Sequence, residues 1–408
     1  MNKIILISKD VLRQDNFSCY GSKVFNTPNI DDLAKKGTIF LHHYAAAPST
    51  AMAFTCMFSG LNAFELNRKD YREVKHFDQV PTLFDILQKK EYACNVIWDD
   101  SFVKLAYRFS KVFGNKTTKF FSLEIGQRVG PHKIDISKIQ KGEDKNSLKK
   151  ILDAVDSLLS KNKLFIWIHL PHVIKGCTGY GTDIDLLDLF IGEIRKRFND
   201  DSIYITADHG QMNLEKGIPI YGHHVYESTI KIPLITPRIN GVDKVTFPTS
   251  NVQLKDIIIY NKLEKQNYIY SDSQYYLQEN RKLAIIKDNY KYIYNKSDRT
   301  EELYDIDFDT NENVNLLIDK FYDRNRLKYY NLEEIYYYPY WNNIQNIYHE
   351  LKNEKDRIWK EGNWYATMAY KVYNFKKMGL ANIRRFSVKK KLVRGRYNST
   401  AKKTFYDK

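Results

Sequence analysis

Cysteine is scarce in this sequence of 408 residues, and its spacing is uninformative for metal binding. There are four cysteines, none in a CxxC pair and none with disulfide-like spacing. A cysteine-based zinc cluster needs such pairs, so the pattern argues against one. Small secreted proteins that depend on disulfides also use many more cysteines. We therefore expect the chain to work in a reducing compartment.

Long apolar segments are also missing. No run approaches the roughly 18 consecutive apolar residues of a transmembrane helix. The chain passes from Met1-Asn2-Lys3 directly into a short strand-like run. It therefore lacks the apolar segment of roughly 7–15 residues that marks a secretory signal. These absences predict a cytoplasmic protein.

Acidic residues are nearly absent from residues 376–408. This segment holds twelve lysines and arginines and a single acid, Asp407, within a chain of net charge +15. Such basic clusters attract anionic lipid or anionic polymers, although a solvated tail is the simpler alternative. Nucleic acid is the weakest candidate partner, because no known reading module is recognisable. We predict that 376–408 contacts an anionic membrane peripherally, at its inner face.

What the sequence does have is a pattern of alternating secondary structure and enough apolar residues, 43%, for a large core. Residues 1–240 alternate strand-like and helix-like segments, which is typical of a layered α/β domain. Residues 241–320 read as a small antiparallel subdomain, and 321–408 as an aromatic and basic extension with helical periodicity around 344–373. The predicted strands are 4–8, 38–40, 94–98, 164–169, 202–207, 232–236, 282–286, 290–295 and 302–305. The predicted helices are 28–36, 50–59, 82–90, 147–160 and 184–198.

Two of the predicted strands end abruptly in residue types that bind metals. The run 4–8 leads to Asp10, and the run 202–207 leads to Asp208 and His209. Apolar, β-branched runs like these are typical of buried parallel strands, and ligands bind at the carboxyl ends of such strands. The two ends together predict one site for a hard cation or zinc. A strand-end turn with a hydrogen-bonded histidine is the alternative for Asp208-His209 alone.

Thr50 stands at the predicted start of a helix, after Pro48-Ser49, and Gly60 marks the end of that helix. A hydroxyl there lies near free backbone N–H groups and the positive end of the helix dipole. The position suits an activated alkoxide or a bound phosphate or sulfate. Alternatively, Thr50 or Ser49 is simply the N-cap.

The order of several stretches resembles the sulfatase branch of the alkaline phosphatase superfamily. The stretches that carry this resemblance, over roughly residues 3–317, are 5–13, 18–21, 27–34, 47–60, 165–172, 188–192, 224–235, 291–295 and 301–306. The resemblance implies an α/β fold with an alkaline-phosphatase-like central mixed sheet flanked by helices. It also implies a small C-terminal antiparallel subdomain, here followed by a basic, partly helical tail.

The resemblance further implies a metal site and a nucleophile. By position, Asp10, Asp208 and His209 would bind one divalent metal ion, and Thr50 would be both ligand and nucleophile. Oxygen and imidazole ligands leave Mn²⁺, Zn²⁺, Mg²⁺ and Ca²⁺ possible. The two-metal relatives carry Asp-x-x-x-His after the Pro-His strand, but residues 179–191 offer aspartates and no histidine. One metal is therefore predicted.

Histidines near the implied site are candidates for binding the ester oxygens or protonating the leaving group. They are His172, His223 and His224. Only one of His223 and His224 can occupy the position of the family's histidine, and His224 is preferred. Alternatively, both are ordinary surface residues. Arg13 could bind the negative charge of the substrate, or its side chain could simply be exposed to solvent. His169 is expected in the core.

One departure from the family decides the predicted chemistry. The C/S-x-P-x-R motif, in which sulfatases make formylglycine, is absent, and Thr50 stands at the nucleophile position. A threonine nucleophile resembles lipoteichoic acid synthases and phosphoethanolamine transferases instead. The leading prediction is therefore a metal-dependent phosphoester transferase or hydrolase acting on an anionic ester, such as a surface polysaccharide or its lipid-linked precursor. The alternatives are a sulfuric ester hydrolase and an inactive glycan-binding protein.

Overall fold

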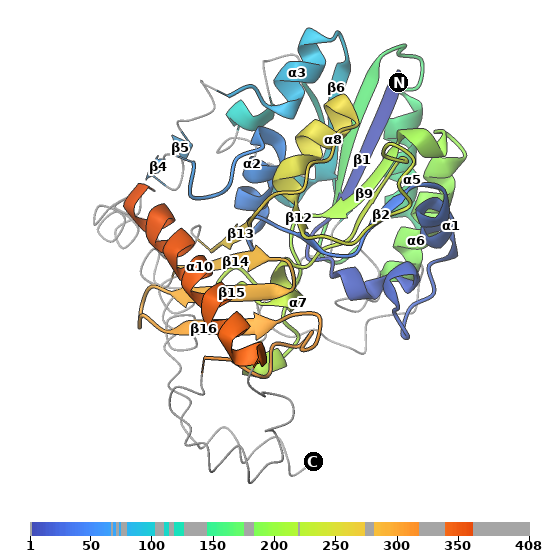
Figure 1. The fold of residues 1–408 in the computed structure, drawn as a ribbon. Helices are drawn as coiled ribbons and strands as arrows, with labels where there is room; N and C mark the ends of the chain where they lie inside the picture. Colours follow the sequence, from blue (N-terminus) through green and yellow to red (C-terminus); the bar gives the residue numbers. More distant parts are fainter. Residues whose placement is uncertain are drawn as a thin grey trace, which may run out of the picture.

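Two sheets organise the chain, an eight-stranded mixed sheet and a four-stranded antiparallel sheet (Figure 1). The computed structural model describes residues 2–66, 68–70, 73–74, 80–102, 110–113, 118–125, 145–174, 183–218, 221–273, 281–317 and 339–361. The larger sheet carries the strand ends that the sequence marks as a metal site.

The order of strands in the large sheet is β11-β2-β10-β9-β1-β8-β6-β7. These strands are β1 (Lys3–Lys9), β2 (Thr38–Phe40), β6 (Ala93–Asp99), β7 (Lys119–Leu123), β8 (Leu164–Leu170), β9 (Ile203–Ala207), β10 (Leu234–Thr236) and β11 (Lys244–Val245). β10 runs antiparallel to both of its neighbours, whereas β9, β1, β8, β6 and β7 are parallel. The central strands are almost wholly buried, as expected where helices cover both faces.

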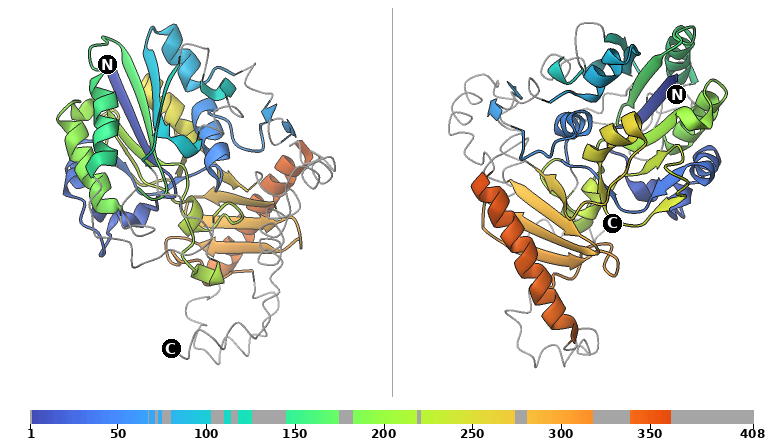
Figure 2. Two further views of the ribbon diagram at one scale, coloured as in Figure 1. Left: turned by 180° about the vertical axis from the view of Figure 1, so that it is seen from behind. Right: turned by 45° about the horizontal axis from the view of Figure 1, so that its top comes forward.

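Helices pack on both faces of this sheet and create two separate cores (Figure 2). One face carries α1 (Pro28–Lys36), α5 (Lys145–Asp156) and α6 (Ile184–Arg195), and the other carries α2 (Thr50–Ser59), α3 (Leu83–Lys89) and α8 (Leu254–Tyr260). Alternate residues of a strand point to opposite faces. Accordingly, Ile4 and Leu6 of β1 enter the core under α2, while Ile5 and Ile7 enter the core under α1.

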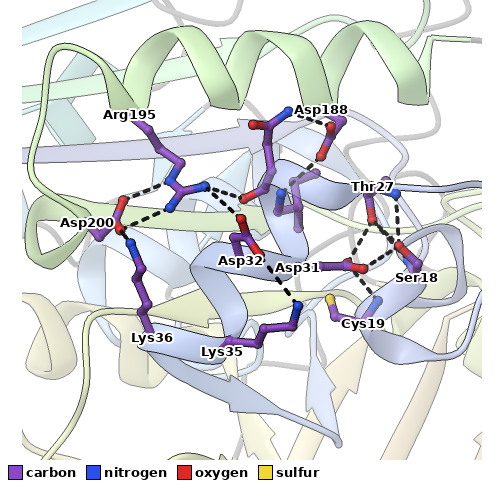
Figure 3. A network of polar contacts seen from close by, with 12 residues as sticks. Ser18, Cys19, Thr27, Asp31, Asp32, Lys35, Lys36, Asp188, Arg195 and Asp200 are labelled. Carbon is purple, nitrogen blue, oxygen red and sulfur yellow. Dashed lines mark hydrogen bonds and ion pairs between the residues drawn. The ribbon is translucent and has the colours of Figure 1, made fainter.

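A polar network joins α1 to α6 (Figure 3). Asp188 of α6 accepts hydrogen bonds from the Ile30 amide at 3.0 Å and the Asn29 side chain at 2.8 Å. Thr27 occupies the N-cap position of α1, but its hydroxyl caps no helix amide and instead accepts from the Ser18 amide at 3.0 Å. The start of α1 is therefore tied to the loop after β1 rather than capped locally.

The small sheet consists of β13 (Ile269–Asp272), β14 (Lys282–Lys287), β15 (Tyr290–Asn295) and β16 (Glu301–Asp305), paired antiparallel in that order. One of its faces packs against α10 (Pro339–Glu361), which lies diagonally across the sheet (Figure 1). The other face packs against Tyr44, Val225 and Ile230 of the large domain. The junction of the two sheets is thus an apolar interface.

The predicted long elements are present, with ends that differ by a few residues. Several short elements were not predicted, because two to four residues carry no readable periodicity. They are β3 (His43–Tyr44), β4 (Arg68–Asp70), β5 (Glu73–Val74), β11, β12 (Thr249–Ser250), β13 and α7 (Glu227–Ile230). The longer elements β7 and α8 were not predicted either. The basic segment 376–408 lies outside the described residues. Among the helices that are described, none combines the length and apolarity that crossing a bilayer requires.

Candidate active site

The parallel strands β1, β8 and β9 bring the predicted metal ligands to one edge of the sheet. Lys9 of β1 stands opposite Ala207 of β9, so the next residues, Asp10 and Asp208, leave the sheet side by side. Asp10, Asp208 and His209 are all buried, and one possible ligand atom of each lies within 4.8 Å of the others. The structure therefore brings together the three residues that the two strand ends predicted.

The backbone after Asp10 is held in an uncommon conformation. Val11 has φ of 63°, which a β-branched residue rarely adopts, and its amide donates to Asp208 Oδ1 at 3.1 Å. The His209 amide donates to the same oxygen at 2.7 Å. Two amides thus fix one oxygen of Asp208, while Oδ2 lies 3.4 Å from His209 Nε2. This arrangement orients Asp208 toward the shared point.

His209 is fixed in one tautomer. Its Nδ1 lies 2.9 Å from the Gly210 carbonyl oxygen, which can only accept, so Nδ1 carries the proton and Nε2 is left with a lone pair. Gly210 is required for this turn, since a Cβ there would lie 2.3 Å from the Ser228 carbonyl oxygen. Nε2 is therefore presented to Asp10, Asp208 and Thr50.

Thr50 is the first residue of α2, and its hydroxyl faces the cluster. Thr50 Oγ1 lies 3.1 Å from His209 Nε2 and 3.4 Å from Asp10 Oδ1. Ser49, not Thr50, occupies the N-cap position, and no side-chain capping bond is present. Of the alternative that Thr50 or Ser49 is simply the N-cap, the structure confirms Ser49 at that position, whereas the Thr50 hydroxyl lies where three possible ligands converge.

Burial makes the cluster electrostatically unfavourable for two ionised acids. It raises the pKa of Asp10 to about 7, helped by the nearby Asp208 charge, and it raises the pKa of Asp208 to about 7. The pKa of His209 is lowered by burial, against the pull of Asp10. A divalent cation would offset these costs, and two carboxylates with one imidazole are a donor set that such ions accept. The residues present fit a bound metal ion.

Lys9 holds the neighbouring loop in place, which the sequence did not predict. Its ammonium is buried and lies 3.1 Å from Asp183 Oδ2, and it donates to the carbonyl oxygens of Pro171 at 3.2 Å and His172 at 2.8 Å. The signal in the sequence was a lysine ending an otherwise apolar strand. Lys9 therefore ties β1 to the turn that carries His172. Asp183, one of the aspartates considered for a second metal, serves this ion pair.

The three candidate histidines lie in two loops. Burial first, and then the charges of Lys9 and His209, lower the pKa of His172 to about 4. His223 is 3% exposed, and the His224 ring stacks on Tyr226 with centroids 5.7 Å apart. Burial, with Lys282 and His223, lowers the pKa of His224 to about 3. Which of His223 and His224 serves the site stays a prediction.

Arg13 forms ion pairs with two acids beside the cluster. Its guanidinium binds Asp15, at 2.9 and 2.6 Å, and Glu215. A cavity of about 320 Å³ lies here, lined by Arg13 and Glu215 together with Tyr20 and Lys231. That Arg13 binds the negative charge of the substrate stays a prediction.

His169 belongs to the core, as predicted. It is fully buried, its Nδ1 lies 2.9 Å from Ser8 Oγ, and its ring packs edge-on against Phe54 at 4.5 Å.

Comparison with known proteins finds similarity in the first part of the chain. Residues 2–173 match the model of the family described as Sulfatase. This match covers less than half of the chain. Over 61 residues the chain is also 38% identical to arylsulfatase D of Homo sapiens, a stretch that covers 15% of this chain and 10% of that protein. The chain thus spans about a tenth of the length of this curated relative.

The similarity to solved structures covers most of the chain. A 2-O GAG sulfatase is similar with a TM-score of 0.59 and 15% identity, over 82% of this chain and 91% of that chain. The phosphonate monoester hydrolase of Agrobacterium radiobacter is similar with a TM-score of 0.59 and 14% identity, over 81% and 94%. At such identities the likeness shows the fold alone. The predicted alkaline-phosphatase-like α/β fold is confirmed.

Proposed function

We propose that this protein is a sulfatase-family, metal-dependent hydrolase of sulfate or phosphate esters, with Thr50 as its nucleophile. The observation that carries the proposal is the place of Thr50 Oγ1, 3.1 Å from His209 Nε2 and 3.4 Å from Asp10 Oδ1. A hydroxyl directed at a buried cluster of metal-ligand types has the surroundings that an activated nucleophile needs.

The chain's own groups would carry the transfer as follows. A bound divalent cation lowers the pKa of a coordinated hydroxyl and neutralises charge on the ester. The Thr50 oxygen attacks the sulfur or phosphorus atom, and the bond from that atom to the leaving oxygen breaks. A threonine ester forms, and water then hydrolyses it to free Thr50. Asp10, Asp208 and His209 hold the cation, and the fixed tautomer of His209 keeps Nε2 available to it.

The candidate histidines suit hydrogen bonding better than proton donation in the substrate-free protein. The pKa values of His172 and His224 are lowered to about 4 and about 3, so both rings are neutral at pH 7. A neutral ring offers one N–H to an ester oxygen. We propose that His172, held by Lys9, binds the ester in this way.

Two lines of support favour different esters. The sulfatase model and the similarity to arylsulfatase D support a sulfuric ester hydrolase over the phosphotransferase that was predicted first. Thr50 supports a phosphate ester, because threonine cannot become formylglycine, the group with which sulfatases act. The substrate that we propose is an anionic ester on a glycan, since one structural neighbour is a 2-O GAG sulfatase.

The proposal is tested by turnover on simple esters. The purified chain, supplied with Mn²⁺ or Zn²⁺, is assayed on p-nitrophenyl sulfate, p-nitrophenyl phosphate and bis-p-nitrophenyl phosphate. We expect metal-dependent release of p-nitrophenol from at least one of them. Preference for the sulfate would favour the sulfuric ester hydrolase, and preference for either phosphate would favour the phosphoester enzyme. No turnover with any metal, with tight glycan binding, would favour the inactive binding protein.

The nucleophile is tested separately by intact mass. Incubation with a slow substrate should add one sulfuryl or phosphoryl group to the wild-type chain, and the substitution Thr50→Ala should abolish the adduct. The matched control is Thr55→Ala in the same helix, because the Thr55 hydroxyl is buried and donates to the Ala51 carbonyl oxygen, at 2.8 Å, inside the helix itself. An adduct that persists in Thr50→Ala would exclude Thr50 as nucleophile.

A further inference from the structure

The cavity beside Arg13 is lined by four segments that meet where the large domain adjoins the small sheet. Its volume is about 320 Å³. The lining residues belong to the loop after β1, the loop after β9, the segment that holds α7 and the loop after β16, within 13–20, 212–216, 226–231 and 310–312. This volume lies at the small end of the roughly 300–1,000 Å³ range of ligand pockets. It suits one small ring rather than a chain of them.

The cavity adjoins the candidate metal site through Gly210, which directly follows His209. A Cβ on Gly210 would lie 3.3 Å from Arg13 Cγ and 2.3 Å from the Ser228 carbonyl oxygen, so this glycine packs between two residues of the cavity lining. The Gly210 amide also donates to the carbonyl oxygen of Thr229 in α7, at 2.8 Å. One residue of backbone therefore separates the cavity lining from a candidate metal ligand.

The charged groups around the cavity balance each other. The lining includes four acids and three cations, Asp15, Glu215, Glu227, Glu312, Arg13, Lys216 and Lys231. The buried Lys291, which forms ion pairs with Glu227 and Glu312, brings the formal charges to four of each sign. Burial raises the pKa of Glu312 to about 7, which shifts this balance by no more than one charge. An anion would face the acids and a cation would face the basic groups, so the cavity suits a ligand without net charge.

The charges that line the cavity already have partners inside the protein. Arg13 forms ion pairs with Asp15 and Glu215, and the Lys231 ammonium lies 3.4 Å from Glu227 Oε2. A zwitterion would have to break such pairs to form its own, which is costly for buried charges. Hydroxyl groups can instead bond to carboxylates that stay paired, because an ionised carboxylate has about four acceptor positions. Hydrogen bonds to an ionised partner are also stronger than neutral ones.

Two further groups in the lining have hydrogen-bonding capacity that the described residues leave unused. The Ser228 hydroxyl forms no hydrogen bond with any of them. The Gln14 side chain, 8% exposed, donates through Nε2 to the carbonyl oxygens of Phe40 at 3.1 Å and Ile232 at 3.3 Å. Its Oε1 accepts no hydrogen bond from the part of the chain that the structure describes. The lining thus offers a hydroxyl and an amide oxygen to a polyhydroxylated ligand.

We propose that the cavity is a subsite for one uncharged sugar ring, the neighbour of the esterified unit in a glycan substrate. The hydroxyls of this ring bond to the paired carboxylates, to Ser228 Oγ and to Gln14 Oε1, while the metal site holds the ester. The inference rests on the proposed function, because it names the part of the substrate beyond the ester. Binding of a neutral sugar itself requires neither an ester nor turnover.

The test measures binding of simple sugars to the Mn²⁺-loaded chain at pH 7.5, by saturation-transfer NMR and calorimetry. The probes are the methyl β-glycosides of glucose, galactose, mannose and N-acetylglucosamine, with glucuronate and glycine as charged comparisons. We expect at least one neutral glycoside to bind with a millimolar Kd. Glucuronate should bind about tenfold more weakly or not at all, because its carboxylate faces the acids of the lining. Binding of glucuronate or glycine alone, or of no neutral glycoside, would overturn the proposal.

Two variants test whether the glycoside binds in this cavity. Ser228→Ala removes a hydroxyl that no described residue uses, so Tm should stay unchanged while glycoside binding weakens by about two- to tenfold, the effect of one hydrogen bond. Thr310→Trp, at an exposed position of the lining, should fill the cavity and weaken binding by about tenfold or more. The matched control is Asn313→Trp, which is exposed but outside the lining and should leave the affinity unchanged.

The outcomes separate the subsite from the proposed function. Equal losses of affinity in Thr310→Trp and Asn313→Trp, or unchanged affinity in both cavity variants, would overturn the subsite. Glycoside binding that Thr310→Trp removes would support the subsite even in a chain that hydrolyses no ester, and only the proposed function would then fail. Ester turnover in a chain that binds no neutral glycoside would refute the subsite alone.

Discussion

Two clusters of buried acids among the described residues differ in what neutralises them. At the edge of the large sheet, Asp10 and Asp208 face His209 and the hydroxyl of Thr50. At the junction with the small sheet, Glu227 and Glu312 face a lysine. The buried Lys291 lies 3.1 Å from Glu227 Oε1 and 2.8 Å from Glu312 Oε1.

The difference shows that buried carboxylates alone do not indicate a metal site. Burial opposes ionisation of Glu227, but Lys291 and Lys231 hold its pKa below the usual value. At the sheet edge the nearest lysine, Lys9, is committed to Asp183, and the pKa of Asp10 is raised to about 7. Burial and the Glu227 charge raise the pKa of Glu312 to about 7 although Lys291 lowers it, so the lysines neutralise the junction pair only in part, whereas the described residues give Asp10 and Asp208 a histidine and no ion-paired lysine.

The largest expected effect comes from removing a ligand at the sheet edge. The substitution Asp208→Asn should lower metal affinity by more than the roughly 10- to 100-fold that loss of a supporting outer group costs. Turnover should fall on the order of 10³-fold, because the hydroxyl of Thr50 is no longer activated. Metal titration by calorimetry and the p-nitrophenyl assays measure both. Wild-type metal affinity in this variant would contradict the assignment.

Removing the lysine of the junction should affect stability instead. The substitution Lys291→Met leaves Glu312 buried without its lysine and Glu227 with Lys231 alone, and should lower the free energy of unfolding by about 3–5 kcal/mol. Urea denaturation measures this. The control Lys265→Met breaks an exposed pair with Asp288 and should cost at most about 1 kcal/mol. Metal affinity should stay unchanged, and a loss of it would remove the distinction between the clusters.

The edge cluster should also make stability depend on pH when metal is chelated. Asp10 and Asp208 have a pKa of about 7 in the folded chain against an ordinary value of 3.8, so between these values the folded state binds more protons than the unfolded state. Stability should therefore fall as pH rises from about 4 to about 7 and level off above. A Tm decrease of a few degrees, about what 1–2 kcal/mol produces, is expected. Asp208→Asn should reduce the decrease, whereas an equal decrease in that variant would assign it to other groups.

The smallest expected effect concerns Arg13, whose partners are partly exposed. Asp15 and Glu215 have side chains 61% and 36% exposed. Arg13→Met should therefore change the free energy of unfolding by at most about 1 kcal/mol. If the ion pairs are its main role, KM should change less than about fivefold, the equivalent of about 1 kcal/mol. A tenfold rise in KM with unchanged Tm would instead assign Arg13 to the substrate.

The large domain and the grouping of the candidate metal ligands could be predicted because their signals are local. A buried parallel strand is a nearly continuous apolar run, and its last residues lie at the ligand-binding edge. The strand before Asp10 and the strand before Asp208 both have this form. Their pairing through β1 and β9 then follows from the fold, and the structure confirms the shared edge.

The remaining features depend on contacts between distant segments. Lys9 and Lys291 look like ordinary lysines in the sequence, and only the fold decides whether each has a buried carboxylate. Both have one. The left-handed conformation of Val11 was equally unpredictable, because a β-branched residue carries no signal for it.

Helix α10 has a consequence for anyone who wants to shorten this chain. Residues 321–408 look like an appendage in the sequence, yet α10 covers Leu283, Ile285, Tyr292 and Leu303 of the small sheet with Ile344, Tyr348 and Leu351. A chain cut at residue 320 would expose that apolar face to water, and such a face promotes aggregation. A soluble, shortened protein should therefore retain every residue through Glu361.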